Sequence, residues 1–201
     1  MSGFLNVLVA GGGFTPVLVS YTTAGTFTET IPGGATTAVI EVFGHSGSGG
    51  LGQTGCTVQG GGAGSGSYAK TTFNVSAQNG KTWDLVLRAA AAGTGLTTTF
   101  NAGATNGVTG FTNITAPGGG NGGNGSSGGN AGAAALTASG GTDLNQTGNA
   151  GIAGSTCGGG AGGAGRTGTN GNGGAGGNGG QGAGSVGRGL GADARVYISY
   201  T

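Results

Sequence analysis

The residues that could do chemistry are few in this sequence, and they are scattered along it. His45 is the single histidine, and it stands beside Ser46 in "FGHSGSGG". Adjacent side chains on an extended chain point to opposite sides, so these two do not make a nucleophile and base pair. The acidic residues are Glu29, Glu41, Asp84, Asp143 and Asp193. Because their spacing gives no pair suited to acid–base work, we expect no enzyme, and His45 is interpreted as a loop or interface residue.

The two cysteines, Cys56 and Cys157, are far apart in the sequence. A disulfide that closes a loop of about a hundred residues stabilises a fold by roughly 4–5 kcal/mol in the chain-entropy model. Two free thiols are the alternative that a reducing compartment favours, and the sequence leaves both open. One histidine and two distant cysteines do not predict a zinc site within one subunit.

The stretch "GGGAGSG" (60–66) is similar to a dinucleotide-binding loop. Such a loop must follow a strand and open a helix. Here glycines precede it and the strand-like "SYAKTTFNVS" follows, so we expect no nucleotide and no other cofactor. A formal net charge of +1 provides no basic surface for nucleic acid.

Glycine dominates the composition, with 57 of 201 residues, and charged residues make up only 5%. The three prolines are too few for collagen. Between 159 and 180, glycine occupies every third position, which is the period of an extended polyproline-II-type helix. Bare positions at this period let neighbouring helices approach until backbone N–H groups meet backbone carbonyls. A polyglycine-II-type array is therefore predicted, and a disordered low-complexity segment is the competing interpretation.

Outside the glycine-rich region, alternating apolar residues predict strands. The expected strands span 26–31, 36–44, 67–76, 82–88 and 194–200. Asn79–Gly80 favours a tight hairpin between the third and fourth of these. The predicted fold is all-β, a small β-sandwich or barrel that carries the glycine-rich insertion.

Three regions follow from these patterns: 1–20, then 21–116 together with 192–201 as the β-domain, then 117–191 as the glycine-rich array. The first region contains "FLNVLVAGGGFTPVLVS" (4–20), which is too short and too interrupted to span a bilayer. It also lacks the basic start of a signal peptide, so we expect assembly in a cytoplasm. Exposed apolar segments usually mark interfaces. The residues expected to dock are Phe4, Leu5, Val7, Leu8, Val9 and Phe14.

The order of motifs resembles a known family. "YTTAGTFTETIPGGATTAVIEVFGHSGSGG" is followed by "GGGAGSGSYAKTTFNV", a glycine-rich body and a closing "GLGADARVYISYT". This resembles the glycine-rich domain of bacteriophage tail-fibre and related virion proteins over residues 21–201. The resemblance implies a non-enzymatic structural protein of a virion assembled in a bacterial cytoplasm. Its implied partners are other virion proteins, further copies of itself, for example in a trimer, and a host cell-surface receptor.

The residues expected to face a receptor lie between glycine helices in "ASGGTDLNQTGNA" (138–150), and they are Asp143, Asn145, Gln146 and Asn149. An inert turn is the alternative for this segment. Two other functions stay open. One is a capsid decoration or head-fibre protein, and the other is an ice- or surface-binding protein that presents a flat face of small residues.

Overall fold

The computed structural model describes residues 13–53, 59–90, 96–125, 128–181 and 189–201. Within them, nine strands form two antiparallel sheets, so the predicted all-β fold is confirmed. The strands are β1 (Val17–Tyr21), β2 (Gly25–Thr30), β3 (Thr37–Phe43), β4 (Tyr68–Asn74), β5 (Thr82–Leu87), β6 (Thr97–Ala102), β7 (Ile114–Pro117), β8 (Leu144–Gln146) and β9 (Arg195–Tyr200). One sheet has the order β1-β9-β3-β4-β8 and the other has the order β2-β5-β6-β7.

The core lies between the two sheets, and the inner strands β5 and β9 each alternate buried and partly exposed positions. In β9 the buried side chains are Val196, Ile198 and Tyr200, as the sequence pattern predicts. On the facing sheet, Trp83 is fully buried with its ring centroid 5.2 Å from that of Phe100. The apolar side chains that alternate along these strands are therefore buried between the two sheets, and their burial stabilises the sandwich.

The predicted hairpin at Asn79–Gly80 is wrong. A turn is present, with Gly80 at a φ of 75° and the N–H of Lys81 donating to the carbonyl of Gln78. It connects strands of different sheets, because β4 pairs with β3 and β8, whereas β5 pairs with β2 and β6. Both strands carry an apolar face that must meet across the core, and a hairpin would have put them side by side in one sheet.

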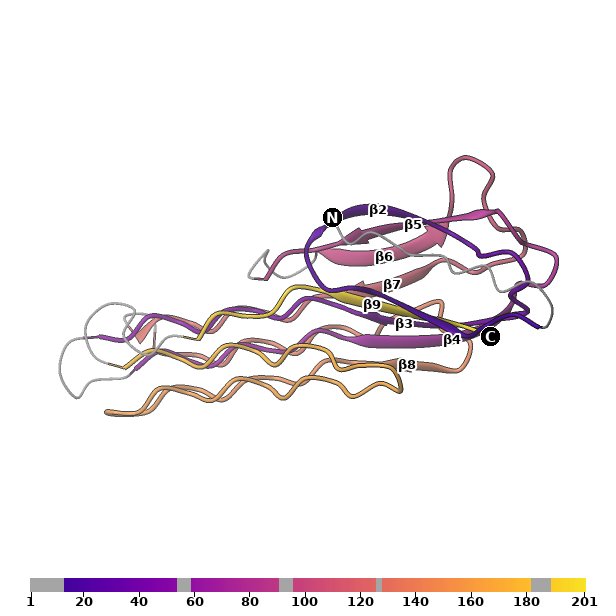
Figure 1. Ribbon diagram of the computed structural model, residues 1–201. Coiled ribbons are helices and arrows are strands. Elements are labelled where there is room, and N and C mark those ends of the chain that lie inside the picture. Colours follow the sequence, from indigo (N-terminus) through magenta and orange to yellow (C-terminus); the bar gives the residue numbers. More distant parts are fainter. Residues whose placement is uncertain (1–12, 54–58, 91–95, 126–127, 182–188) are drawn as a thin grey trace.

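Glycine-rich segments continue from the strands and extend from one end of the sandwich (Figure 1). The described residues contain eight of them, which we name L1 (44–53), L2 (59–67), L3 (118–125), L4 (128–137), L5 (147–154), L6 (159–166), L7 (173–181) and L8 (189–194). Chain order makes odd-numbered segments run away from the sandwich and even-numbered ones return. L1 and L2 lie within 21–116, so the glycine-rich structure draws on the predicted β-domain as well as on 117–191.

Candidate functional site

L2 is the centre of the glycine-rich structure, which we call the lattice. Its N–H groups donate in rotation to three segments: Gly61 and Gly64 to L3, Gly62 and Ser65 to L5, Gly60 and Ala63 to L7. The carbonyl groups of the same three pairs accept from L1, L4 and L6 respectively. These twelve bonds measure 2.7–3.4 Å between nitrogen and oxygen. Within the described residues, L2 is thus hydrogen-bonded to six neighbours, and no backbone group of 60–65 is left unpaired.

The six neighbours of L2 are also bonded to one another. In order around L2 they are L1, L3, L4, L5, L6 and L7, with one link being the N–H of Gly120 to the carbonyl of Ala133 at 2.9 Å. L8 lies outside this ring and bonds to L1 and L7. The described segments therefore pack hexagonally in three layers, L3-L1-L8, L4-L2-L7 and L5-L6, which is consistent with the stacked segments in Figure 1. The bonds of L2 rotate through three directions in three residues, and three residues is also the length of one turn of a polyproline-II-type helix.

Glycine is required in the lattice because the segments approach too closely for side chains. A Cβ atom built on Gly61 or Gly64 would collide with a carbonyl oxygen of L4, and one on Gly62 with the carbonyl oxygen of Ala161 in L6. Within 60–67 of L2 the side chains are small, as at Ala63 and Ser65, which are both fully buried. The low volume of the side chains thus permits the backbone contacts that hold the segments together.

Asparagine side chains complete the hydrogen bonding where a segment lacks a backbone neighbour. The amide oxygen of Asn121 accepts from the N–H of Ser48 at 2.9 Å, and that of Asn124 accepts from Leu51 at 2.8 Å. The two asparagines are three residues apart, so they repeat with the lattice period. A side-chain amide has the same donor and acceptor groups as a peptide bond, which lets Asn replace an absent segment at the lattice edge.

Glu41 joins the sandwich to the lattice, a role that the sequence analysis missed. Its carboxylate is fully buried and accepts the hydroxyl of Tyr68 at 2.6 Å. It also accepts the N–H groups of Thr169 at 2.6 Å and Asn170 at 2.7 Å, in the turn 167–172 between L6 and L7. Burial, followed by the hydrogen bond and charge of Glu41, raises the pKa of Tyr68. The position of Glu41 on the same strand face as Phe43 was the available signal.

His45 and Ser46 lie at the start of L1, and both are buried. The Ser46 hydroxyl accepts the N–H of Ala192 at 2.6 Å and donates to the carbonyl of Ala175 at 2.9 Å. It therefore connects L1, L7 and L8. The His45 imidazole packs against Gly118, and burial lowers its pKa. His45 is thus an interface residue within the chain, between the lattice and the sandwich.

The four residues expected to face a receptor are divided by the structure. Asp143 and Asn145 are exposed, and the Asp143 carboxylate accepts the Thr72 hydroxyl at 2.6 Å, which lowers the pKa of Asp143. Gln146 is half-buried in β8. Asn149 belongs to the lattice, because its side-chain amide donates to the carbonyl of Ala164 at 2.8 Å. Asp143 and Asn145 are therefore the members of this set that present free surface.

The remaining sequence-predicted residues are partly outside the described residues. Cys157 is disulfide-bonded, while Cys56 is not described, so their pairing stays a prediction. Of the expected docking residues, Phe4, Leu5, Val7, Leu8 and Val9 are not described either. Phe14 is half-buried and packs against the sandwich core, so its side chain does not extend freely toward a partner.

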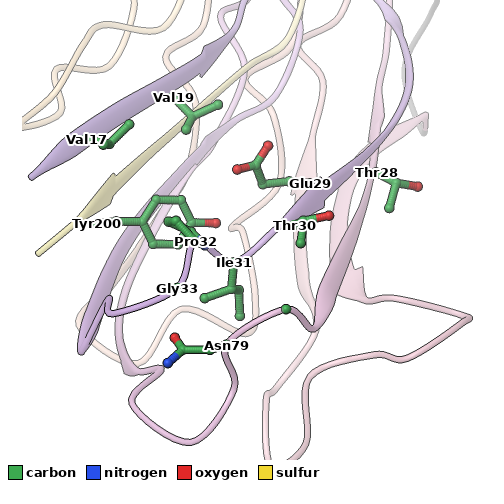
Figure 2. A pocket seen from close by; sticks show the side chains of 11 residues that line it. Val17, Val19, Thr28, Glu29, Thr30, Ile31, Pro32, Gly33, Asn79 and Tyr200 are labelled. Carbon is green, nitrogen blue, oxygen red and sulfur yellow. The ribbon is translucent and has the colours of Figure 1, made fainter. Parts of the chain in front are cut away.

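A groove opens on the side of the sandwich where the edge strands β1 and β2 face each other (Figure 2). Its volume is about 690 Å³, with Val17 and Val19 on one wall and Tyr200 on its floor. The carboxylate of Glu29 lies on the other wall and accepts the hydroxyl of Tyr21 at 2.6 Å. Burial raises the pKa of Glu29.

Within the described residues, no three His, Cys, Asp or Glu side chains are gathered closely enough to hold a metal ion. The same residues contain no helix that is long and apolar enough to cross a membrane. Comparison with models of known families and with curated proteins gives no match for this chain.

Proposed function

We propose that this protein is a non-enzymatic structural component of a bacteriophage virion, in a tail fibre or tail tip. The resemblance of its motif order to glycine-rich virion domains supports this assignment. The observation that carries it is the central position of L2, whose backbone is bonded to six neighbours. A thin fibre or tip on a virion has to keep its shape without a large apolar core. Segments that are hydrogen-bonded through their backbones can provide this rigidity.

The exposed residues 142–145, at the turn that leads into β8, are the proposed contact with a host receptor. Asp143 is oriented by Thr72, and the Asn145 side chain both accepts from the N–H of Gly141 and donates to its carbonyl. Polar groups held by local hydrogen bonds bind a partner with a smaller loss of conformational entropy than free side chains. Several copies would act together in each particle, for which a trimer is the proposed arrangement.

Cryo-electron microscopy of the particle that carries this protein tests the proposal. Density for a few copies at the tail is the expected result. Several hundred copies on the shell would instead identify a capsid decoration protein, and absence from the particle would refute a virion role altogether.

Host adsorption tests the receptor turn separately. Particles that carry both Asp143→Ala and Asn145→Ala should bind host cells with an affinity at least about tenfold lower at equilibrium, the effect of losing roughly 1.4 kcal/mol of binding. Gln181→Ala, at an exposed position in L7, is the matched control. Equal adsorption of both variants would exclude the turn as a receptor contact.

A further inference from the structure

Asparagine is followed directly by glycine at seven places in the described chain, which are 79–80, 106–107, 121–122, 124–125, 170–171, 172–173 and 178–179. In this dipeptide the backbone nitrogen of glycine can attack the side-chain carbonyl carbon of asparagine, because glycine has no side chain to hinder the approach. A five-membered succinimide ring forms and ammonia leaves. Water then opens the ring to give aspartate or isoaspartate. Asparagine is thermolabile in proteins, and the fold decides which of the seven residues reacts first.

The reaction requires a glycine nitrogen that can lose its proton and turn toward the asparagine side chain. A hydrogen bond from this N–H group to a carbonyl oxygen holds the proton and the peptide plane in place. A glycine held in this way reacts only after the bond opens, so the free energy of local opening slows the reaction. An opening free energy of about 1.4 kcal/mol corresponds to a tenfold slower reaction.

Five of the seven glycines are held by such a bond. Each donates its N–H to a backbone carbonyl at 2.8–3.0 Å, and the pairs are Gly80 to Ile31, Gly122 to Ser48, Gly125 to Leu51, Gly173 to Arg166 and Gly179 to Gly160. Three of these bonds belong to the lattice, where Asn121, Asn124 and Asn178 are exposed on its surface. The lattice therefore protects these asparagines through the glycines that follow them, although their side chains are open to water.

The dipeptide 170–171 is held by other contacts. It lies in the turn 167–172, in which the N–H of Gly168 donates to the carbonyl of Gly171 at 2.8 Å. The N–H of Asn170 is bonded to Glu41, and a Cβ built on Gly171 would collide with the ring of Tyr197. These contacts fix the peptide between the two residues against the sandwich, so its nitrogen is not free to turn.

Asn106 and Gly107 differ from the other six dipeptides. Asn106 is exposed, and within the described part of the chain the N–H of Gly107 donates to no carbonyl. The carbonyl of Asn106 accepts the N–H of Thr82 at 3.0 Å, and its side-chain amide donates to the carbonyl of Gly80 at 2.9 Å. An exposed asparagine is thus held in place beside a glycine nitrogen that no backbone bond restrains.

We propose that Asn106 is a deamidation site, and that in the folded protein it reacts before the other six Asn–Gly asparagines. This assignment goes beyond the proposed function and does not depend on it. The product lowers the formal net charge from +1 by one, and its carboxylate cannot donate to Gly80. The new charge also lies in the turn whose Ala104 N–H is bonded to the carboxylate of Asp84 at 2.7 Å. Deamidation therefore loosens the contact between this turn and the turn at Gly80.

Peptide mapping by mass spectrometry tests the proposal on the intact protein, incubated in the folded state at mildly alkaline pH. Conversion at Asn106 is expected to be at least about tenfold faster than at Asn121, Asn124 or Asn178. Equal rates at these four positions would refute the assignment. The same incubation in concentrated urea is the control, because the protecting bonds are lost there and the difference should disappear. A preference for Asn106 that persisted in urea would overturn the structural reason and attribute it to the neighbouring sequence.

Two glutamine variants give a second readout by isoelectric focusing. Glutamine would have to close a six-membered ring, which forms more slowly, so Asn106→Gln should remove the acidic species that appears first. Asn172→Gln is the matched control, because Asn172 is also exposed and followed by glycine, but the N–H of Gly173 is bonded to Arg166. This variant should become acidic at the original rate. An unchanged rate in Asn106→Gln, or a loss of the acidic species in Asn172→Gln, would contradict the proposal.

Discussion

Replacement of Gly62 by alanine is the sharpest test of the lattice. Gly62 lies in the central segment L2, where its N–H donates to Ile152 at 2.8 Å and its carbonyl accepts from Gly132 at 2.7 Å. The new methyl group would collide with the carbonyl of Ala161 in L6. Because the colliding atoms belong to backbone, no side chain can rotate away to make room.

The size of the effect follows from the bonds between L2 and L6. To relieve the collision, L6 must move by at least about 1 Å. Its two bonds to L2, from Gly160 at 2.9 Å and from Gly163 at 2.8 Å, would then exceed hydrogen-bonding distance. A buried group left without a partner costs about 1–3 kcal/mol. Loss of these two bonds should therefore lower the free energy of unfolding by roughly 2–6 kcal/mol, which for a chain of this size is a fall in Tm of roughly 4–24 °C.

Differential scanning calorimetry measures this shift, and Gly33→Ala is the matched control. Gly33 has no atom within 4 Å of the position that a Cβ would occupy. The same substitution there should leave Tm unchanged or raise it slightly, since alanine restricts the unfolded chain. If Gly62→Ala melted within about 2 °C of the control, the close backbone contact described for L2 would be refuted.

Three further outcomes are expected. Glu41→Gln should lower the free energy of unfolding by about 1.5–3 kcal/mol, because a charged acceptor of three hydrogen bonds is lost. Amide hydrogen exchange should then become faster first in the turn 167–172. Unchanged exchange in this turn would contradict the role of Glu41 in joining the sandwich to the lattice. The folded-state pKa of His45 lies below its ordinary value of 6.5, so the unfolded chain takes up the proton first and stability should fall as pH drops below about 6.5. Urea unfolding at pH 5–8 measures how the free energy of unfolding changes with pH. His45→Gln should make this change smaller. An unchanged pH dependence in the variant would show that other groups cause it. Non-reducing peptide mapping should find Cys56 joined to Cys157, and Cys157→Ser should cost about 2–5 kcal/mol; recovery of unlinked Cys56 would refute the pairing.

Much of the sandwich could be predicted from the sequence, because its determinants are local. A strand with one buried face shows period-two alternation wherever it lies in the sheet. For this reason the ranges 82–88 and 194–200 could be predicted as the strands β5 and β9 before their partners were known. The partners themselves required the tertiary structure. The turn at Gly80 is visible in the sequence, but whether it joins neighbours in one sheet or crosses between sheets depends on the remaining strands.

The glycine repeat determined the lattice contacts in part. Bare positions at period three indicate that segments can approach closely, and the asparagines at 121 and 124 repeat with the same period. Which segment lies at the centre was decided by the tertiary structure, and L2 has the shorter glycine run "QGGGAGSGS" rather than the long repeat of 159–180. The buried carboxylate of Glu41 was likewise hidden, since its donors Thr169 and Asn170 are more than a hundred residues away. In a lattice bonded through its backbone, every residue offers the same donor and acceptor. The side chains in the sequence therefore indicate where segments can approach one another. Which segments become neighbours is decided only in the folded chain.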